Sequence, residues 1–207
     1  MKPFKEYFDL TNEKMGIPIR HTINLIKNRA SYIHDNVCNQ KYGDGLPYSY
    51  HLKMVADTAI EYGHLYCEHE HYENHENYIL PIVFGAYFHD AIEDARMTYN
   101  DVLKVAEEFM THEQAVMATE IVYALTDEKG RNRAERGSAK HYADIRATLY
   151  APFVKWCDRY CNWKYSVETG SRMAEVYTKE MPEFIDKLGG DRFLPKELIG
   201  KVLPDLV

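Results

Sequence analysis

The sequence lacks a long apolar segment, a Cys-x-x-Cys motif and any excess of positive charge. No hydrophobic run approaches the roughly 20 residues that a membrane-spanning helix needs. The start of the chain has no apolar stretch of the kind found in signal peptides, so we expect a soluble, cytoplasmic protein with no membrane partner. The four cysteines are scattered, and only Cys157 and Cys161 lie close together. Because this spacing matches neither a redox motif nor a structural zinc site, reduced thiols are expected.

The charge balance narrows the class of partner. With a formal net charge of −7 over 207 residues, the chain has no broad electrostatic attraction for nucleic acid or for anionic membranes. A small anionic substrate is compatible with this charge, because binding it requires only a local cationic pocket or a metal ion. The length suffices for one large domain, or for a domain with a small appendage.

The alternation of apolar and polar residues that is typical of β-strands is also scarce, whereas apolar residues recur at helical spacing along most of the chain. We expect an all-α fold, a compact helical bundle, with Thr98 as the N-cap of one helix. The expected helices span residues 19–39, 49–62, 78–94, 98–109, 113–125, 142–167 with a kink or break at Pro152, and 172–188. Irregular segments are expected at 64–77 and 127–140, and loops of this length are usually functional or mobile.

Four side chains that handle metals or protons stand within six consecutive residues at the end of an apolar run. They are His89, Asp90, Glu93 and Asp94. On a helix, at about 100° per residue, all four would lie within an arc of roughly 140°. Carboxylates beside a hydrophobic core are costly unless a cation or hydrogen bonds compensate them, and at a helix C-terminus they also oppose the helix dipole. The segment therefore predicts a metal site rather than a simple acidic helix end.

Further ligands must come from other parts of the chain. His51 stands near the start of the expected second helix. Asp158 is a conspicuous carboxylate in an apolar stretch, and Asn162 follows one turn later on the same face. Two histidines and two aspartates provide mixed nitrogen and oxygen ligands and leave positions for water or substrate. Such a set suits Mn²⁺, Fe²⁺ or Zn²⁺ better than Ca²⁺ or Mg²⁺ alone.

Two further segments allow more than one interpretation. Residues 127–140 hold five basic side chains against three acidic ones, and form either a phosphate-binding loop or a solvated flexible segment. The basic residues are Lys129, Arg131, Arg133, Arg136 and Lys140. One cysteine and three histidines near 64–77 could hold a second metal ion, but their spacing matches no defined pattern, so we expect a solvated insertion. They are Cys67, His69, His71 and His75.

The order His, His-Asp, Asp along a helical chain resembles the HD-domain metal-dependent phosphohydrolases. One branch is closer, because His-Asp-x-x-Glu-Asp at 89–94 is similar to the hydrolase domain of RelA/SpoT proteins and to the small alarmone hydrolases. Three other stretches agree with that branch in order and approximate spacing. They are Gly45-Leu-Pro-Tyr-Ser-Tyr-His51 (Gly-x-Pro-Tyr-x-x-His), Ala124-Leu-Thr-Asp127 (Val-Thr-Asp or Val-Thr-Lys) and Val154 to Asn162 (Lys-x-x-Asp-Arg-x-x-Asn). The resemblance covers about residues 30–165 and implies a single HD-type domain over 1–207, with a C-terminal helical extension at about 168–207.

The resemblance also implies a role for each candidate residue. Metal ligation would fall to His51, His89, Asp90 and Asp158, while Glu93 and Asp94 would position and deprotonate the attacking water. This division agrees with general chemistry, because a metal lowers the pKa of bound water and screens phosphate charge, and a nearby carboxylate can accept the proton. The metal expected in such a phosphohydrolase is Mn²⁺, with Fe²⁺, Zn²⁺ or Mg²⁺ as alternatives.

In that branch the substrate is ppGpp or pppGpp, which loses its 3′-pyrophosphate. Asn162 would contact the substrate, and the basic loop with Arg159 would grip the pyrophosphate. Where the family places an arginine that stacks on guanine, this chain offers Lys41 and the ring of Tyr42.

Two alternatives stay open at this point. The protein could be an HD phosphohydrolase for another nucleotide, such as a nucleoside monophosphate or a phosphorylated dinucleotide, or a nucleotide-binding HD module without turnover. The intact Glu93-Asp94 pair argues against the second, since a domain without catalysis needs no water-activating carboxylate. Another His-Asp pair, His34-Asp35, lacks Glu-Asp partners, and we expect it to have a surface or packing role.

Overall fold

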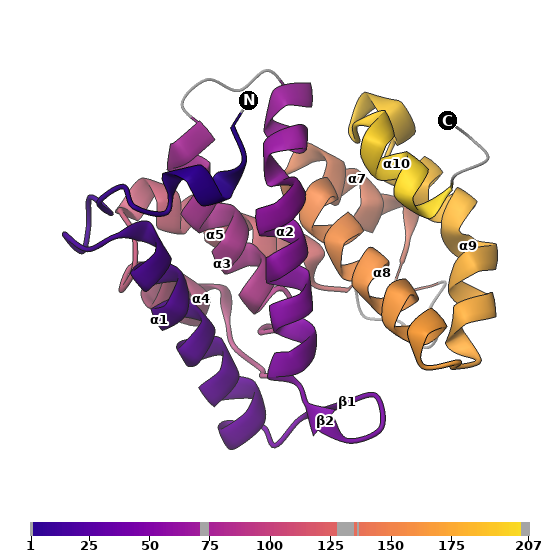
Figure 1. Cartoon of the computed structure of the whole chain (residues 1–207). Helices are drawn as coiled ribbons and strands as arrows, with labels where there is room; N and C mark the ends of the chain where they lie inside the picture. The colour runs from indigo at the N-terminus through magenta and orange to yellow at the C-terminus, as the bar shows by residue number, and fades with distance from the viewer. Residues whose placement is uncertain (1, 71–74, 128–134, 136, 204–207) are drawn as a thin grey trace.

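Nine α-helices and one short hairpin make up the described part of the chain, in a computed structural model that covers residues 2–70, 75–127, 135 and 137–203 (Figure 1). The expectation of an all-α bundle is confirmed. The central helix is α3 (Ile79–Phe88), every residue of which is buried, and a helix that is hydrophobic on all sides belongs inside a core. It packs against α1 (Ile19–Ser31), α2 (Ser49–His69), α5 (His112–Leu125) and α8 (Ala151–Glu168).

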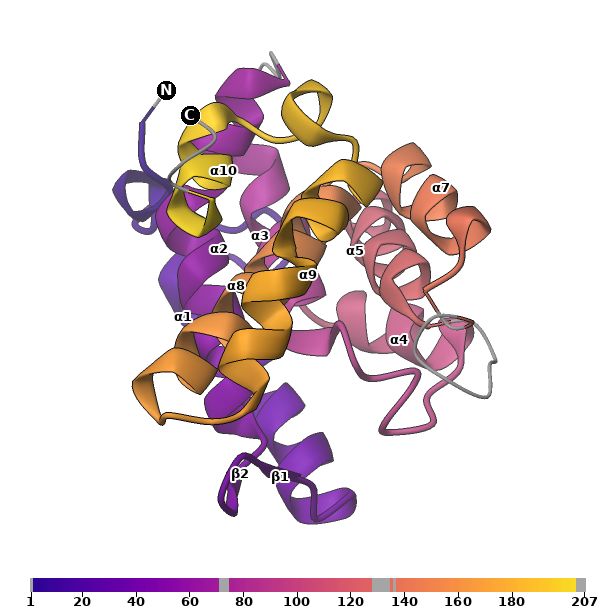
Figure 2. The same ribbon diagram turned by 90° about the vertical axis from the view of Figure 1, so that its right-hand side faces the viewer.

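The other elements surround this group. The helix α4 (Tyr99–Ala106) packs on α5, α7 (Ala139–Ala147) contacts α5 and α8, α9 (Met173–Lys187) lies along α8, and α10 (Lys196–Val202) contacts α9 (Figure 2). Single helical turns occupy Phe4–Tyr7, His75–Tyr78 and Gly190–Arg192. None of the helices in these ranges is both long and apolar enough to cross a membrane.

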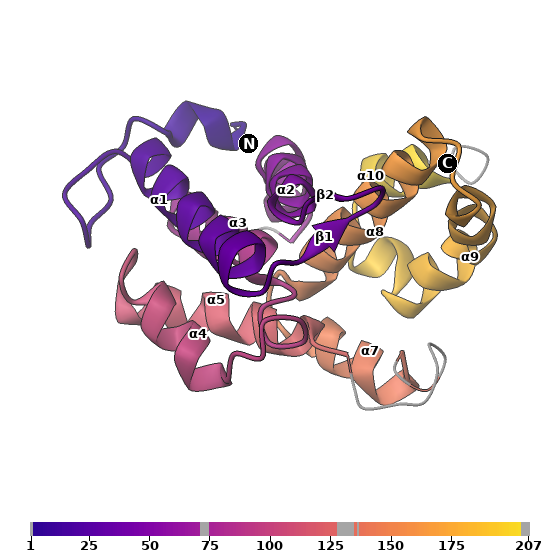
Figure 3. The same cartoon turned by 90° about the horizontal axis from the view of Figure 1, so that it is seen from below.

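A hairpin of β1 (Lys41–Tyr42) and β2 (Leu46–Pro47) precedes α2. Seen from below, it extends from the end of α2 toward α8 (Figure 3). Its turn contains Gly43, with φ +51°, and a Cβ at this position would lie 2.3 Å from the Tyr165 hydroxyl oxygen on α8. Glycine therefore lets the hairpin approach α8 closely, and this places β1 beside the predicted metal ligands.

Several helix boundaries differ from the expectation. The helix α2 continues through Gly63 to His69, so the first part of the supposed irregular segment 64–77 is helical. Gly63 is needed for packing and is no break, because a Cβ there would meet the Phe4 ring at 2.3 Å. The expected break at Pro152 is confirmed: α7 ends at Ala147, Tyr150 has φ +65°, and Pro152 stands in the first turn of α8.

The expected helix 78–94 ends six residues early, at Phe88, and residues 89–94 form turns. One helix-like bond persists, from the Asp94 amide to the Asp90 carbonyl at 2.8 Å. Carboxylates are disfavoured at the C-terminal end of a helix, and Asp90 and Asp94 are instead held by side chains from another part of the chain. The prediction of one continuous helical face for these residues is therefore wrong, although the residues do stay together. Thr98 is the N-cap of α4, as expected, and forms a capping box with Asp101.

Candidate metal centre

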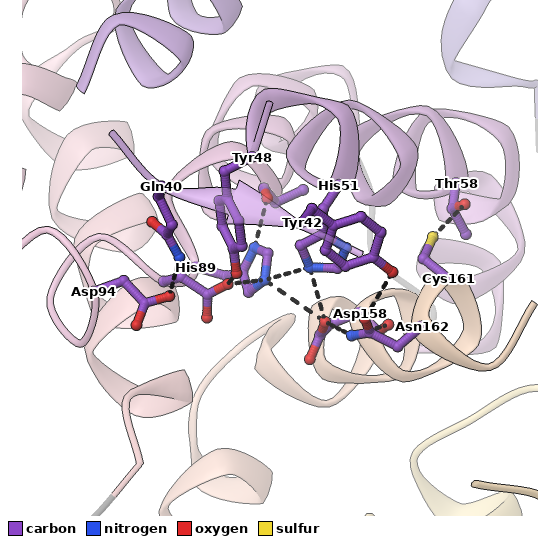
Figure 4. A network of polar contacts seen from close by, with 12 residues as sticks. Gln40, Tyr42, Tyr48, His51, Thr58, His89, Asp94, Asp158, Cys161 and Asn162 are labelled. Atoms are coloured by element: carbon purple, nitrogen blue, oxygen red, sulfur yellow. Dashed lines mark hydrogen bonds and ion pairs between the residues drawn. The ribbon is translucent and has the colours of Figure 1, made fainter. Parts of the chain in front are cut away.

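Three separate segments bring the four predicted ligands together. Figure 4 shows three of them, His51, His89 and Asp158, with their side chains facing one another. His51 is in the first turn of α2, His89 and Asp90 directly follow α3, and Asp158 lies in the middle of α8. These three helices pack against one another, so the side chains meet where the helices converge. Both histidines are buried, and the two aspartates are partly buried.

The distances between the donor atoms match those around a bound metal ion. His51 Nε2 and His89 Nε2 are 3.3 Å apart, and Asp90 Oδ2 is 2.9 Å from His89 Nε2. Asp158 Oδ1 is 3.2 Å from His51 Nε2 and 3.6 Å from His89 Nε2. With metal–ligand bonds of about 2.0–2.2 Å, neighbouring ligands at octahedral or tetrahedral angles lie about 2.8–3.6 Å apart. These four separations fall in that range. Among the described residues, His51, His89 and Asp90 form a group whose donor atoms all lie within 4.8 Å of one another, and Asp158 adjoins this group through the two histidines.

Neighbouring groups orient the donors. The Ala86 carbonyl, at 2.9 Å, accepts the Nδ1 proton of His89, which directs Nε2 at the site. The Tyr48 hydroxyl donates to Asp90 Oδ2, and the Asn162 amide donates to Asp158 Oδ1 at 2.6 Å. Outer hydrogen bonds of this kind are typical of metal centres, in which they hold each ligand in position.

The carboxylates of Asp90 and Asp158 make the cluster attractive to positive charge. Burial alone would lower the pKa of His89, but the charges of Asp90 and Asp158 outweigh it and raise the pKa to about 9. Burial alone would raise the pKa of Asp158, but the His51 hydrogen bond and the charges of His89 and Lys155 hold it below its ordinary value. The carboxylates are thus ionised and draw a proton onto buried imidazole, and a divalent cation would satisfy the same demand.

In contrast to Asp158, the two remaining carboxylates of the 89–94 segment, Glu93 and Asp94, have raised pKa values. Burial, and then the charges of Asp127, Asp90 and Asp94, raise the pKa of Glu93. Burial and the Asp90 charge raise the pKa of Asp94 as well, against a hydrogen bond from Gln40 Nε2 to Asp94 Oδ2 at 2.6 Å. These groups therefore bind a proton more readily than ordinary carboxylates, as a proton acceptor near neutral pH should.

A cavity of about 440 Å³ opens beside Asp158 and Asn162, between α7, α8 and α9. Its wall combines cations, acids and aromatic rings: Lys155, Arg159, Lys187, Asp127, Glu180, Glu183, Tyr142, Tyr177 and Phe184. Burial opposes the charge of Lys155, but the carboxylates of Asp158 and Asp127 raise its pKa and keep it cationic. The cavity thus offers a positive charge one helical turn from Asp158, a predicted metal ligand.

The structure connects some of the predicted substrate-binding residues to this region. Asn162 lines the cavity, and its Oδ1 accepts a hydrogen bond from the Tyr42 hydroxyl at 3.0 Å. The Tyr42 ring stacks on His51, with centroids 4.7 Å apart. Arg159 also lines the cavity, but it forms an ion pair with Glu180 at 3.0 Å and lies over the Phe184 ring.

Other predicted substrate-binding residues lie elsewhere. Lys41 is exposed on β1. Lys140 forms an exposed ion pair with Asp144 at 3.0 Å and lines a second cavity, between α5 and α7, so it is not placed in the cavity beside Asp158. Arg131, Arg133 and Arg136 lie outside the described residues.

Four residues near the site were not identified from the sequence. Tyr48 and Lys155 stand within motifs that carry the family resemblance, so those motifs held a signal for them. Gln40 lies outside those motifs, so the sequence held no corresponding signal for it. We expected His34 to have a surface or packing role. It is fully buried and packs on Tyr48, which agrees with the packing alternative and excludes the surface one, and it also contacts Gln40. In comparisons with known proteins, no family model and no curated protein matches this chain.

Proposed function

We propose that the protein is a metal-dependent phosphohydrolase of the HD type that removes the 3′-pyrophosphate of ppGpp or pppGpp. The observation that carries the proposal is the convergence of two histidine nitrogens and two carboxylates from three segments of the chain. Glu93 and Asp94 follow in the same turn and interact electrostatically with Asp90. The order of these residues along the chain, and the motifs around them, resemble the alarmone hydrolases.

The donor set fits a divalent transition metal. His51, His89, Asp90 and Asp158 would hold the ion. A set of imidazoles and carboxylates suits Mn²⁺, Fe²⁺ or Zn²⁺ better than Mg²⁺, and the resemblance to the HD phosphohydrolases favours Mn²⁺ among them. When bound, the ion supplies charge stabilisation for phosphate oxygens and a lowered pKa for a coordinated water.

The remaining residues provide proton transfer and positioning. Glu93 and Asp94 have raised pKa values and would accept the proton of the attacking water. Lys155 would supply positive charge to a phosphate in the cavity, and Asn162 would hold Asp158 while facing the same space. The cavity of about 440 Å³ is in the range of small-molecule sites, which begins near 300 Å³.

A second candidate is hydrolysis of a less highly charged nucleotide, such as a nucleoside monophosphate. It is favoured because two predicted substrate-binding residues already have partners within the protein. Glu180 forms an ion pair with Arg159, and Tyr42 stacks on His51 and donates a hydrogen bond to Asn162. Glu180 and Glu183 also line the cavity, which disfavours a substrate with many negative charges.

A nucleotide panel with purified protein and Mn²⁺ separates the two candidates. Release of pyrophosphate from ppGpp supports the alarmone reaction, and orthophosphate release from nucleoside monophosphates alone would replace it with the second candidate. Glu93→Ala combined with Asp94→Ala should abolish turnover while the metal content is kept, and Glu13→Ala, at an exposed distant acid, serves as the control. If nucleotides bind but none is hydrolysed, the protein is a binding module.

A further inference from the structure

His34 occupies an unusual place for a polar side chain. It is fully buried, in a π-helical turn (Tyr32–Val37) that follows α1, and π turns are frequent at functional sites. Its ring stacks on Tyr48, with centroids 5.2 Å apart, and Tyr48 in turn donates a hydrogen bond to Asp90. The Nε2 atom of His34 has no hydrogen-bond partner in the described part of the chain, so the ring is hydrogen-bonded through Nδ1 alone.

The Nδ1 atom of His34 lies 2.7 Å from Gln40 Oε1. The backbone reinforces this contact, because the Gln40 amide donates to the His34 carbonyl at 2.9 Å. The chain reverses between these two residues at Asn39, whose φ of +50° is tolerated by asparagine better than by most residues. Gln40 is thus tied to His34 by both its main chain and its side chain.

The other end of the Gln40 amide donates to Asp94 Oδ2 at 2.6 Å. An ionised carboxylate only accepts hydrogen bonds, so the NH₂ group of Gln40 must face Asp94 and its oxygen must face His34. His34 must then carry its proton on Nδ1. In the reversed arrangement the Gln40 oxygen would face the Asp94 carboxylate, which repels it. The carboxylate, the amide and the imidazole therefore specify one another's orientation.

Asp94 depends on this contact. It stands in an exposed turn, and Gln40 is the one side chain among residues 2–70, 75–127 and 137–203 that hydrogen-bonds its carboxylate. We propose that His34 and Gln40 are positioning residues, which hold the Asp94 carboxylate in the orientation needed to accept a proton at the metal centre. This inference rests on the proposed hydrolytic function. Burial lowers the pKa of His34, in agreement with a neutral ring that has one defined tautomer.

The test compares substitutions that keep or remove the donor. Gln40→Met has a similar length but no hydrogen bonds, and should lower kcat about 10- to 100-fold, with KM and bound Mn²⁺ unchanged, because small displacements of a catalytic group have effects of this size. His34→Leu should act in the same way. His34→Asn retains a donor at the place of Nδ1 and should restore most of the rate. Asn36→Ala, exposed in the same π turn, is the matched control.

A second readout does not depend on turnover. Long-range ¹H–¹⁵N NMR should find His34 protonated on Nδ1 in the metal-free protein, and this state should be lost in Gln40→Met. Gln40 is only partly buried, so its variants bear on the inference even if His34→Leu does not fold.

Two results would overturn the inference: a wild-type kcat in Gln40→Met, or a proton on His34 Nε2 in the wild-type protein. Failure of the proposed function gives a different result. Either the Glu93→Ala and Asp94→Ala double variant keeps full activity, or the wild-type protein has no activity on the nucleotide panel. In that case the NMR experiment decides the arrangement of His34 and Gln40 independently.

Discussion

Substitution of Asp158 by alanine should remove most of the stabilisation that Mn²⁺ gives to the fold. Asp158 is one of four converging donors, and its Oδ1 lies 3.2 Å and 3.6 Å from the two histidine Nε2 atoms. It also accepts from His51 in the metal-free protein, so Asp158→Ala changes stability without metal as well. The quantity to compare is therefore the shift in Tm on adding metal, and not Tm itself.

The size of the shift follows from mass action. At a metal concentration of about 100 times Kd, binding stabilises the folded state by about 2.7 kcal/mol, or roughly 5–11 °C in Tm for a chain of this length. Loss of a direct ligand should weaken binding by at least the factor of about 100 that removal of a hydrogen-bonded supporting residue can cost. At the same metal concentration the stabilisation then falls to about 0.4 kcal/mol, a shift of roughly 1–2 °C.

Differential scanning fluorimetry with and without Mn²⁺, after treatment with a chelator, measures this difference. The matched control is Asp57→Ala, which removes an exposed aspartate of α2 that is paired only with Lys53 in the described structure, and should leave the metal-dependent shift intact. A wild-type shift in Asp158→Ala would show that Asp158 is no ligand. If Mn²⁺, Fe²⁺, Zn²⁺ and Mg²⁺ all fail to shift the wild-type protein, the metal centre itself is refuted.

Three further predictions concern the proposed proton acceptor Glu93, the contact between α3 and α5 in the core, and the N-cap of α4. The pKa of Glu93 is raised, so the folded metal-free protein keeps this proton at a higher pH than the unfolded chain, and the stability associated with it is lost as pH rises through the raised pKa. Glu93→Gln should therefore raise the metal-free Tm at neutral pH while abolishing turnover, and parallel Tm profiles of the two proteins from about pH 4 to pH 8 would contradict this. Gly85→Ala places a Cβ 2.7 Å from Ile121 Cγ2, where α3 meets α5, and should cost about 1–3 kcal/mol in chemical denaturation. Adding Ile121→Ala should make the double variant more stable than the sum of the single effects, and strict additivity would count against the clash. Thr98→Ala removes the capping box of α4 and should cost about 1 kcal/mol, seen as a Tm lower by roughly 2–4 °C, whereas an unchanged Tm would mean that the cap contributes nothing.

Much of the fold was predictable because its signals are local. Helical spacing, the Thr98 cap and the proline at position 152 act within a few residues, and the structure has the corresponding helix, capping box and break. Boundaries set by tertiary contacts were not predictable. Gly63 resembles a helix end in the sequence, but its role is decided by the Phe4 ring, which is distant in the chain.

The same division applies to the site. The sequence by itself determined the residue types: a histidine and three carboxylates after an apolar run, with a second histidine and an isolated aspartate elsewhere. Chemistry restricts what such residues do beside a core, so the candidates for a metal centre could be named before their positions were known.

Only the tertiary structure decided how these residues meet. The packing of α2, α3 and α8 sets the separations between the donor atoms at 2.9–3.6 Å. These distances cannot be derived from the spacing of the residues in the sequence. It also paired Arg159 with Glu180 and brought Gln40 to Asp94, 54 residues away. Hydrogen bonds and ion pairs act over a few ångströms, and the fold alone determines which side chains come within that reach.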